Sequence, residues 1–406
     1  MRTGIILDNE LNSDIRVLRE IGILKEHGHE LFVLCFGFRK KYESPLPGVS
    51  VERINIPGKI KDTLFFLLNT IPFYEWMWAF RIKKFILRNN LEVVHAHDLY
   101  MSKASYRGIK RSGKRIPLIL DLHENYPFTV QTYNWTKGFF RSRISKPRTW
   151  TVKEQEYMNY ADRVIVLSAD FKELLLKRYP HMKEENFYVV PNVPDLTVRL
   201  SGTIEKAENP FINGFPVILY YGVIAERRGI FDAITAFSEL VKQNSAVNFL
   251  FIGPVDKKDQ ERFNEQMECN DLDGRICHIP WINAADLPSY LSISDICIAP
   301  FHKNPQHESG VANKIYDYML GAKPLIVSDC KPQMELVERH SCGLVFSDIP
   351  GMKEAIIKLV SDSDLRIVMG KNGYEAVMRY YNMGILKSGL LGLYDSLHSE
   401  NQVKTN

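Results

Sequence analysis

The sequence predicts an α/β protein made of two doubly wound domains, each with a parallel β-sheet covered by helices on both faces. Three observations support this prediction. The chain has 406 residues, about twice the length of an ordinary domain. Short runs of Val, Ile and Leu alternate with helix-compatible stretches, which is typical of sheets buried on both faces. A polar segment rich in Pro and Gly, at about residues 195–215, separates two sets of such runs.

Each half is expected to contribute six strands. The first set covers residues 3–8, 29–36, 91–96, 117–122, 163–168 and 187–190. The second set covers residues 217–221, 248–253, 276–280, 296–300, 324–328 and 343–346. We therefore expect two Rossmann-like domains at residues 1–195 and 196–380, followed by a C-terminal segment at residues 381–406.

Composition favours a soluble globular protein, because 45% of the residues are hydrophobic and 25% are charged. None of the six cysteines forms a C-x-x-C pair, and several lie in apolar strand-like runs, which predicts reduced thiols and a cytoplasmic location. Met1 leads directly into the first strand, so no signal peptide is expected. The most apolar segment, residues 64–80, contains Asn69, Pro72 and Glu75, so no membrane span is expected either.

Charge is distributed unevenly along the chain. Residues 1–200 carry 32 Lys and Arg against 22 Asp and Glu, whereas the remainder carries 20 against 26. Residues 101–150 alone hold 11 basic and 2 acidic side chains. The first half is therefore expected to face an anionic partner: a membrane surface, a phosphorylated acceptor or nucleic acid.

Doubly wound domains bind ligands at the carboxyl ends of their strands, and two facing domains place the chemistry in the cleft between them. After the strand at 217–221 come Gly222, Arg227, Arg228 and Gly229, and a helix is expected to begin at that last glycine. Free N–H groups at a helix N-terminus, together with an arginine fork, suit a diphosphate. The alternative is a solvated basic turn.

A second segment follows the strand at 296–300 and combines small residues with polar ones, namely Glu308, Ser309, Gly310, Ala312, Asn313, Lys314 and Asp317. Asn313 is placed to cap a helix. Lys314 and Asp317 share one face of its first turn, where a cation suits a phosphate and a carboxylate suits ribose hydroxyls. The alternative is a Lys–Asp pair on the surface, which contributes little.

Polar residues also follow the strands of the first half. His123 follows the strand at 117–122, where it is placed to donate to a sugar hydroxyl or act as a base, unless it is structural. His97 and Asp98 give a similar, weaker signal after the strand at 91–96. The loop after the first strand contains Asn12, Ser13, Asp14 and Arg16, and it either meets an acceptor or caps the following helix.

Taken together, these segments resemble the retaining glycosyltransferases of the GT-B fold, family 4 type (glycosyl transferases group 1). In the second half the resemblance rests on Tyr220–Gly229, Phe251–Pro254, Pro280–Trp281, Leu287–Asp295 and Asn313–Pro324. In the first half it rests on Arg16–Arg19, Gly28–Glu30, His95–Asp98, His123 and Ala161–Ser168. Single motifs are moderately specific, and their order and spacing across nearly the whole chain are specific.

The resemblance implies two domains facing a central cleft, with the acceptor bound by the first and the nucleotide sugar by the second. A final helix at Leu386–His398 would cross back to the first domain. Arg228 and Lys314 would hold the diphosphate, Asp317 the ribose, and His123 the donor sugar near its reacting carbon. The other donor-site residues would be Gly222, Arg227, Gly253, Pro280, Trp281, Glu308, Ser309, Gly310, Ala312 and Asn313. The acceptor-site residues would be Asn12, Ser13, Asp14, Arg16, His97 and Asp98.

Two departures from the family pattern leave the sugar unidentified. The family has two glutamates eight positions apart, and here Asp317 stands for the second. Ser309 occupies the first position, with Glu308 one residue away. Val223 also replaces a basic residue that the family often has after the glycine at 222, and Arg227 is placed to compensate.

The expected chemistry is transfer with retention, by front-face attack and without a covalent enzyme nucleophile. Two cations and a helix N-terminus would stabilise the leaving phosphate in place of a metal, so we expect no metal and no cofactor. The one Asp-x-Asp candidate, Asp271 to Asp273, precedes a strand and is assigned to a surface loop. UDP is expected more than GDP, and a glycan or lipid-linked acceptor in surface polysaccharide or lipopolysaccharide assembly.

Basic and aromatic residues are interleaved at residues 57–90 and again at 135–148. This pattern suits peripheral contact with an anionic inner leaflet, or else a core helix with a solvated basic face. Nucleic acid is not expected as a partner, because it would leave the strand-end residues unexplained. Two rival functions stay open: a nucleotide-sugar 2-epimerase of the same architecture, and a non-catalytic partner subunit.

Overall fold

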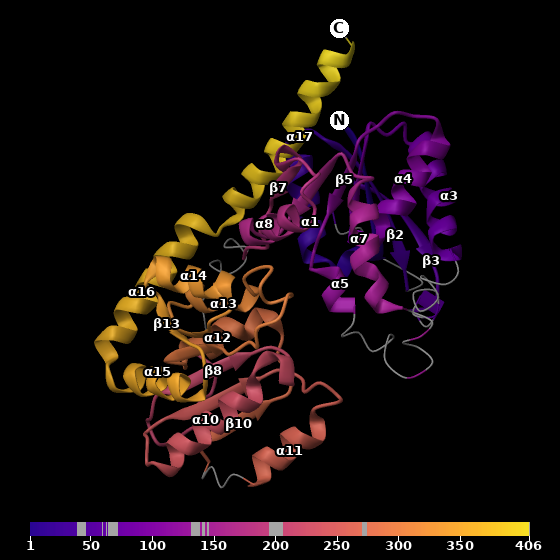
Figure 1. Cartoon of the computed structure of the whole chain (residues 1–406). Helices are drawn as coiled ribbons and strands as arrows, with labels where there is room; N and C mark the ends of the chain where they lie inside the picture. The colour runs from indigo at the N-terminus through magenta and orange to yellow at the C-terminus, as the bar shows by residue number, and fades with distance from the viewer. Residues whose placement is uncertain are drawn as a thin grey trace. The chain divides into compact units, whose positions relative to one another are not determined.

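The structure, a computed structural model, describes residues 1–38, 46–58, 60–61, 63, 72–130, 139, 143, 146–194, 206–269 and 274–405. The chain divides into two compact units (Figure 1). Unit 1 comprises Met1–Asn192 and Leu386–Asn406, and unit 2 comprises Val193–Ile385. Each unit is an α/β structure around one parallel sheet.

Unit 1 contains a seven-stranded sheet in the order β3-β2-β1-β4-β5-β6-β7, with every pair parallel. Its strands are β1 (Arg2–Glu10), β2 (Glu30–Gly37), β3 (Ser50–Asn55), β4 (Val93–His97), β5 (Leu118–Asp121), β6 (Arg163–Val166) and β7 (Phe187–Val189). The strand order reverses between β1 and β4. Ligands of doubly wound sheets bind beyond the carboxyl ends of the strands at such a switch point.

Unit 2 repeats this arrangement with a six-stranded parallel sheet in the order β10-β9-β8-β11-β12-β13. Its strands are β8 (Val217–Tyr221), β9 (Asn248–Ile252), β10 (Ile276–Ile279), β11 (Ile296–Ala299), β12 (Leu325–Ser328) and β13 (Gly343–Phe346). The switch point lies between β8 and β11. The predicted fold class, two doubly wound parallel sheets, is confirmed.

Helices connect the strands. In unit 1 they are α1 (Ile15–Glu26), α3 (Phe73–Arg88), α4 (Ser102–Ser112), α5 (Tyr126–Thr129), α7 (Trp150–Met158) and α8 (Ala169–Arg178). In unit 2 they are α10 (Ile230–Lys242), α11 (Gln260–Cys269), α12 (Leu287–Ser292), α13 (Asn313–Leu320), α14 (Lys331–His340), α15 (Ile349–Ser361) and α16 (Ser363–Tyr380). None of the helices in the described ranges is long and apolar enough to span a bilayer.

The continuous apolar runs of the sequence are explained by cores on both faces of each sheet. In β8, Ile218 and Tyr220 belong to the core beneath α10 and α15, whereas Val217 and Leu219 belong to the core beneath α13 and α14. Strand side chains alternate between faces, so every position of a sheet covered on both sides must be apolar.

All twelve predicted strands are present, and β3 is the strand that the sequence analysis missed. Its sequence, Ser-Val-Glu-Arg-Ile-Asn, contains two adjacent charges, and Ile54 is its one fully buried residue. β3 lies at the edge of the sheet and pairs with β2 alone. An edge strand tolerates charged side chains, which removes the apolar signal by which the other strands are recognised.

The last helix, α17 (Met383–Thr405), begins at the end of unit 2, and from Leu386 onward it belongs to unit 1. Its buried side chains, at helical spacing, are Leu386, Leu390, Leu393, Tyr394 and Leu397. The Tyr188 hydroxyl of β7 donates to Ser396 Oγ over 2.9 Å. Unit 1 is thus completed by the end of the chain.

Candidate active-site residues at the strand ends

Two glycines bring the backbone of unit 2 close to a buried lysine. Gly222 follows β8 with φ +129°, and Gly253 follows β9 with φ +141°. A Cβ at Gly222 would lie 2.6 Å from Lys314 Nζ, and a Cβ at Gly253 would lie 2.3 Å from the Gly222 carbonyl oxygen. The positive φ favours glycine at both positions, and at Gly253 the neighbouring backbone also leaves no space for a side chain.

Lys314 lies in the first turn of α13, and its side chain is buried. Its Nζ lies 3.8 Å from the ring centroid of Tyr220 and 5.2 Å from that of Phe301, and it finds no hydrogen-bond partner within the described residues. Burial, together with the nearby charge of Arg228, lowers the pKa of Lys314 well below its usual range. A buried ammonium without a partner is costly, and an anionic ligand would offset that cost.

Arg228 closes a 3-10 turn, Glu226–Arg228, which ends at Gly229 with φ +68°. A Cβ at Gly229 would lie 1.6 Å from the Pro300 carbonyl oxygen, so the turn is packed directly against the end of β11. The guanidinium lies 5.3 Å from the Phe301 ring, and its buried Nε has no partner in the described part of the chain. Burial lowers the pKa of Arg228.

The N-terminus of α10 adds N–H groups to these two cations. Gly229 is its N-cap residue, and no side chain hydrogen-bonds to the first turn in the structure as described. The switch point between β8 and β11 therefore combines Arg228, Lys314 and an uncapped helix N-terminus. Such an arrangement can bind and stabilise phosphate oxygens.

The predicted partners of Lys314 lie nearby, but they differ in environment. Asp317 is buried one turn further along α13, which excludes the alternative of a solvated Lys–Asp surface pair. Ser309 is buried and its Oγ donates to the Pro305 carbonyl oxygen over 2.5 Å, whereas Glu308 is half-buried and accepts from the Lys331 backbone N–H over 3.3 Å. The choice between Ser309 and Glu308 as counterpart of the family's first glutamate stays open.

The prediction that Asn313 caps the helix is wrong. Ala312 is the N-cap residue of α13, and Asn313 is its first helical residue, with an exposed side chain. Ala312 offers no side-chain acceptor, so the first N–H groups of α13 are left without a cap from the predicted residue.

The remaining predicted donor-site residues are less enclosed. Arg227 is half-buried and pairs with Asp256 over 3.2 Å, and Gly310 is half-buried. Pro280 is exposed, and Trp281 follows it with 74% of its surface exposed. Trp281 therefore presents a large aromatic ring to solvent directly after β10.

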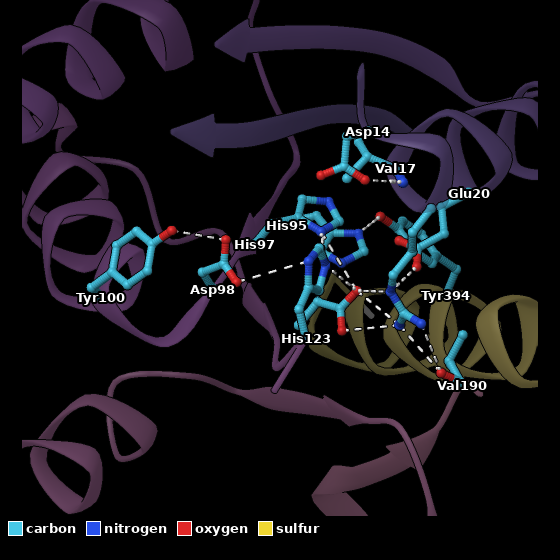
Figure 2. Close-up of polar contacts among 12 residues, drawn as sticks. Asp14, Val17, Glu20, His95, His97, Asp98, Tyr100, His123, Val190 and Tyr394 are labelled. Atoms are coloured by element: carbon cyan, nitrogen blue, oxygen red, sulfur yellow. Dashed lines mark hydrogen bonds and ion pairs between the residues drawn. The ribbon is translucent and has the colours of Figure 1, made fainter. Parts of the chain in front are cut away.

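In unit 1, neighbouring strands bring the predicted histidines together (Figure 2). His97 ends β4 and lies opposite Asp121, which ends β5. His97 Nδ1 lies 3.0 Å from His123 Nε2, and Asp121 Oδ2 lies 3.3 Å from the same His123 nitrogen. On its other side, His123 Nδ1 lies 3.8 Å from Asp98 Oδ1.

Arg16 lies inside this cluster. Its side chain is buried, and its guanidinium donates to both oxygens of Asp121 over 3.1–3.2 Å and to the Val190 carbonyl over 3.2 Å. Arg16 also forms an ion pair with Glu20, one turn further along α1, at 3.1 Å. Its guanidinium therefore meets internal partners, and its assignment to the acceptor stays a prediction.

The charges of the cluster shift its protonation. Burial lowers the pKa of His123, but the carboxylates of Asp121 and Asp98 outweigh burial and raise it to about 9. Burial raises the pKa of Asp121, but Arg16 and His123 outweigh it, so this pKa lies well below its usual range. His123 is therefore a cation, and Asp121 an anion, at neutral pH.

The predicted acceptor loop is partly occupied by local contacts. Asp14 caps α1 by accepting from the Val17 N–H over 3.1 Å, which confirms the capping interpretation for this residue. The exposed Ser13 donates to the Glu10 carbonyl over 2.9 Å, and the exposed Asn12 accepts from Arg53 over 3.0 Å. Asp98 accepts from the Tyr100 hydroxyl over 3.0 Å.

Sequence reasoning missed four members of the unit 1 cluster as site residues, namely Glu20, His95, Asp121 and Tyr394. Two signals were present: His95 and His97 are two apart in a strand and share a face, and Glu20 is four residues from Arg16 in a helix. No local pattern relates Tyr394 to His95, yet its hydroxyl lies 3.1 Å from His95 Nδ1.

Glu20, His95, His97 and Asp121 have potential metal-ligand atoms within 4.8 Å of one another. The Arg16 guanidinium, however, pairs with both carboxylates of this group, so the chain itself supplies the positive charge that balances them. The other metal candidate, Asp271 to Asp273, lies outside the described residues, as does most of the basic-aromatic stretch at 135–148.

Comparison with known proteins identifies the family of the chain. Residues 16–198 match the family described as Glycosyltransferase Family 4, and residues 202–376 match Glycosyl transferases group 1. The chain is 22% identical to an alpha-D-kanosaminyltransferase of Streptomyces kanamyceticus, over 78% of this chain and 81% of that one. It is also 22% identical to the capsular polysaccharide biosynthesis glycosyltransferase CapM of Staphylococcus aureus, over 50% and 51%.

Solved structures resemble the whole chain. Sucrose-phosphate synthase from Thermosynechococcus elongatus matches with a TM-score of 0.74 and 17% identity, over 98% of this chain and 100% of that one. HepE of Anabaena, solved in complex with UDP, matches with a TM-score of 0.67 and 13% identity, over 98% and 100%. These likenesses support the GT-B fold, and the family matches account for both halves, so the chain belongs to the group 1 glycosyltransferases of family 4 type.

Proposed function

We propose that this glycosyltransferase takes a nucleoside-diphosphate sugar as donor and transfers the sugar, with retention, without a metal ion. Arg228 and Lys314 bind the diphosphate, Asp317 binds the ribose, and UDP is preferred over GDP. The observation that carries the proposal is the pair of cations at the switch point of unit 2, the buried Lys314 and the half-buried Arg228, where Lys314 Nζ has no partner among the described residues.

The physical argument is electrostatic. As the bond between the sugar and the diphosphate breaks, negative charge builds on the leaving phosphate oxygens. Arg228, Lys314 and the N-terminus of α10 are already fixed in a desolvated site, where such charges interact strongly and need no reorganisation. They do what a divalent cation does in other enzymes. The acceptor hydroxyl then attacks from the face that the diphosphate leaves, and its proton passes to a leaving phosphate oxygen.

Relatives suggest the substrates. HepE, which shares the fold, is described in complex with UDP, and CapM is described as acting in capsular polysaccharide biosynthesis. We propose a UDP-sugar donor and a glycan or lipid-linked acceptor on these grounds. His123 is proposed to contact the transferred sugar, and Asn12, Ser13, Asp14, His97 and Asp98 to lie toward the acceptor.

The test is thermal stabilisation of the purified protein by nucleotides and nucleotide sugars with EDTA present. A ligand that binds the folded state raises its melting temperature. A shift with UDP that disappears in Arg228→Ala and Lys314→Ala is expected. Lys371→Ala is the matched control, because Lys371 is 73% exposed in the same unit and should leave the shift unchanged.

The same preparation separates the rival functions. Transfer to an acceptor, with an NMR coupling constant that shows an unchanged anomer, supports the proposal. Conversion of the donor without any acceptor would instead favour a 2-epimerase. Donor binding without transfer or hydrolysis would favour a non-catalytic subunit. No stabilisation by any nucleotide would contradict the assignment of the diphosphate site.

A second proposal concerns an apolar stripe on α3, formed by Phe73, Trp76, Phe80 and Leu87. These four side chains share one helical face, and each is 49–54% exposed. Exposed cations border them: Arg81, Lys84 and Arg88 lie on the same helix, and Lys84 Nζ lies 4.4 Å from the Phe80 ring. Aromatic rings with interspersed cations suit the interface of an anionic bilayer, which we propose as the partner of the α3 stripe.

Co-sedimentation with vesicles that contain anionic lipid tests this proposal. Binding at low salt should fall at least several-fold in Trp76→Ser/Phe80→Ser. Ile367→Ser is the control, because Ile367 is an exposed apolar residue of α16 in unit 2. Equal binding by all three proteins would remove the α3 stripe from consideration, and no binding at all would remove the membrane.

A further inference from the structure

A buried polar chain lies behind His123. Asp121 is fully buried and contacts three groups at once: His123 Nε2 at 3.3 Å, His97 Nδ1 at 3.5 Å, and the Arg16 guanidinium at 3.1 Å. The His97 ring stacks on His95 at 4.5 Å, and His95 Nδ1 lies 3.1 Å from the Tyr394 hydroxyl of α17. Figure 2 shows this chain, with the His123 ring at one end and Tyr394 at the other.

We infer that Asp121, itself held by Arg16, is a positioning residue that keeps the His123 ring doubly protonated and presents its Nδ1–H to the donor substrate. The inference rests on the proposed function in one respect, because it takes His123 to contact the transferred sugar. Asp121 would act through His123 and would not touch substrate.

The geometry fixes which nitrogen is available. His123 Nε2 faces the interior, where His97 and Asp121 have no exposed surface. On this side the Nε2–H has two neighbours that can accept from it, the Asp121 carboxylate at 3.3 Å and His97 Nδ1 at 3.0 Å. His123 Nδ1 faces Asp98 at 3.8 Å, which is longer than a hydrogen bond. This nitrogen has no hydrogen-bond partner among the residues described, so its N–H remains available to a ligand oxygen.

The titratable and charged groups packed around His123 come from three parts of unit 1. From β4 and the turn after it come His97 and Asp98, from β5 comes Asp121, and from α1 come Arg16 and Glu20. The two carboxylates that face the ring directly stabilise its charged form, and burial alone favours the neutral form. Arg16 keeps Asp121 ionised, because a lone carboxylate at this depth would take up a proton. A buried carboxylate that orients an imidazole and stabilises its charged form is a known catalytic arrangement.

Asp98 shows that the outer side of His123 is also constrained. Its φ of +71° with ψ of +142° is a backbone conformation that residues other than glycine rarely adopt. Such a conformation is strained, and it persists where the surrounding structure imposes it. Here it holds the Asp98 carboxylate 3.8 Å from His123 Nδ1.

The test measures the charge of His123 directly, by long-range ¹H–¹⁵N correlation spectra of the full chain labelled with [¹⁵N]histidine. His123→Gln identifies its signals. At pH 7.5 we expect both ring nitrogens of His123 to show protonated shifts, with a midpoint near pH 9. His29 and His307 are internal controls, because burial lowers the pKa of each to about 4 and both should be neutral.

In Asp121→Asn the His123 midpoint should fall by about two pH units or more, toward the ordinary histidine value of about 6.5. His307, in unit 2, should not change. Arg16→Met/Asp121→Asn removes both buried charges and covers the case in which the single variant does not fold. The fall of kcat at alkaline pH should move to lower pH by the same amount, with little change in the KM for donor.

Two outcomes separate this inference from the proposed function. A neutral His123 at pH 7.5 in the wild-type protein, or an unchanged midpoint in a folded Asp121→Asn, would overturn the inference whatever the protein binds. Loss of nucleotide-induced stabilisation in the wild-type protein would overturn the donor site while leaving the His123 titration as evidence. Retained stabilisation by UDP in Asp121→Asn, with a shifted pH profile, supports both.

Discussion

Two kinds of buried charge distinguish the strand ends of this protein. In unit 1 the charges are matched: Arg16 pairs with Asp121 and Glu20, and His123 lies beside Asp121 and Asp98. In unit 2 they are not: the buried Lys314 and the half-buried Arg228 both lie near the Phe301 ring, and the charge of Arg228 adds to burial in lowering the pKa of Lys314. A matched cluster holds its own geometry, whereas an unmatched pair of cations gains most from an anionic ligand.

We therefore expect the Lys314 side chain to lower the free energy of unfolding of the ligand-free protein, although it contributes to binding of the nucleotide. Lys314→Met keeps the apolar stem and removes the buried ammonium, which should raise the free energy of unfolding by about 1–3 kcal/mol. The variant should also lose stabilisation by UDP. Urea unfolding with and without nucleotide measures both effects. The exposed Lys371→Met should change stability by less than about 0.5 kcal/mol. A destabilised Lys314→Met would mean that the ammonium has a structural partner.

His123 should make stability depend on pH. Its pKa is about 9 in the folded protein and about 6.5 when unfolded, so folding favours the protonated form. This contribution is fully present below about pH 6.5 and is lost as pH rises through 9, with a magnitude on the order of 3 kcal/mol. The difference in free energy of unfolding between wild type and His123→Gln, measured from pH 6 to 9.5, should shrink accordingly. A difference independent of pH would show that His123 is neutral.

At the scale of secondary-structure elements, the N-termini of three helices lie among the candidate site residues. α1 begins after a capping aspartate, α10 begins at an uncapped glycine, and α13 begins after an alanine without a capping side chain. The two helices at the switch point of unit 2 thus begin without a hydrogen bond from the side chain of the N-cap residue, as the proposed phosphate site requires. The first turn of α1 is capped by Asp14, whose side chain accepts a hydrogen bond from the Val17 N–H.

Removal of the side chain that caps α1 should destabilise unit 1. Asp14→Ala should cost about 1 kcal/mol, because it leaves the Val17 N–H without its acceptor. It should also raise the KM for acceptor if the loop at residues 8–14 meets that substrate. Asp348→Ala is the matched control, since Asp348 caps α15 in unit 2 by accepting from the Gly351 N–H over 2.7 Å. An equal effect of both variants on the acceptor KM would argue against the loop assignment.

At the scale of the whole molecule, the chain returns to its first unit at the end. Leu386–Asn406 belongs to unit 1, although more than 190 residues of unit 2 separate it from Asn192. Its Tyr394 contacts His95 and packs edge-on against His29 at 5.0 Å. The last helix therefore contributes both apolar area and one end of the polar chain behind His123.

Deletion of the chain from Leu386 onward should destabilise unit 1 and spare unit 2. Five buried side chains of α17 would be lost, each contributing about 1.5–3 kcal/mol on burial. Hydrogen exchange should then show lost protection in β1, β4 and β7, while UDP should still protect the loops after β8 and β11. A deletion that leaves the exchange of unit 1 unchanged would contradict the packing of α17.

The sequence by itself determined the elements and the class of fold. Strands at 217–221 and 343–346 were predicted with the residues that the structure gives, because a strand covered on both faces needs an unbroken apolar run. β3 was not predicted, because an edge strand does not need an unbroken apolar run. Gly222, Arg228 and Lys314 were also singled out from the sequence, since each lies between a strand and the end of the first turn of the next helix, and their role in donor binding stays a prediction.

Only the tertiary structure decided which of these side chains are buried and what they meet. That Lys314 lies over Tyr220, that Arg16 clamps Asp121, and that Asp14 caps a helix while Asn313 does not are outcomes of packing. Tyr394 reaches His95 across 299 residues of sequence. Hydrophobic periodicity is set by neighbours along the chain, whereas burial, pairing and protonation depend on sheet order and on distances that span it.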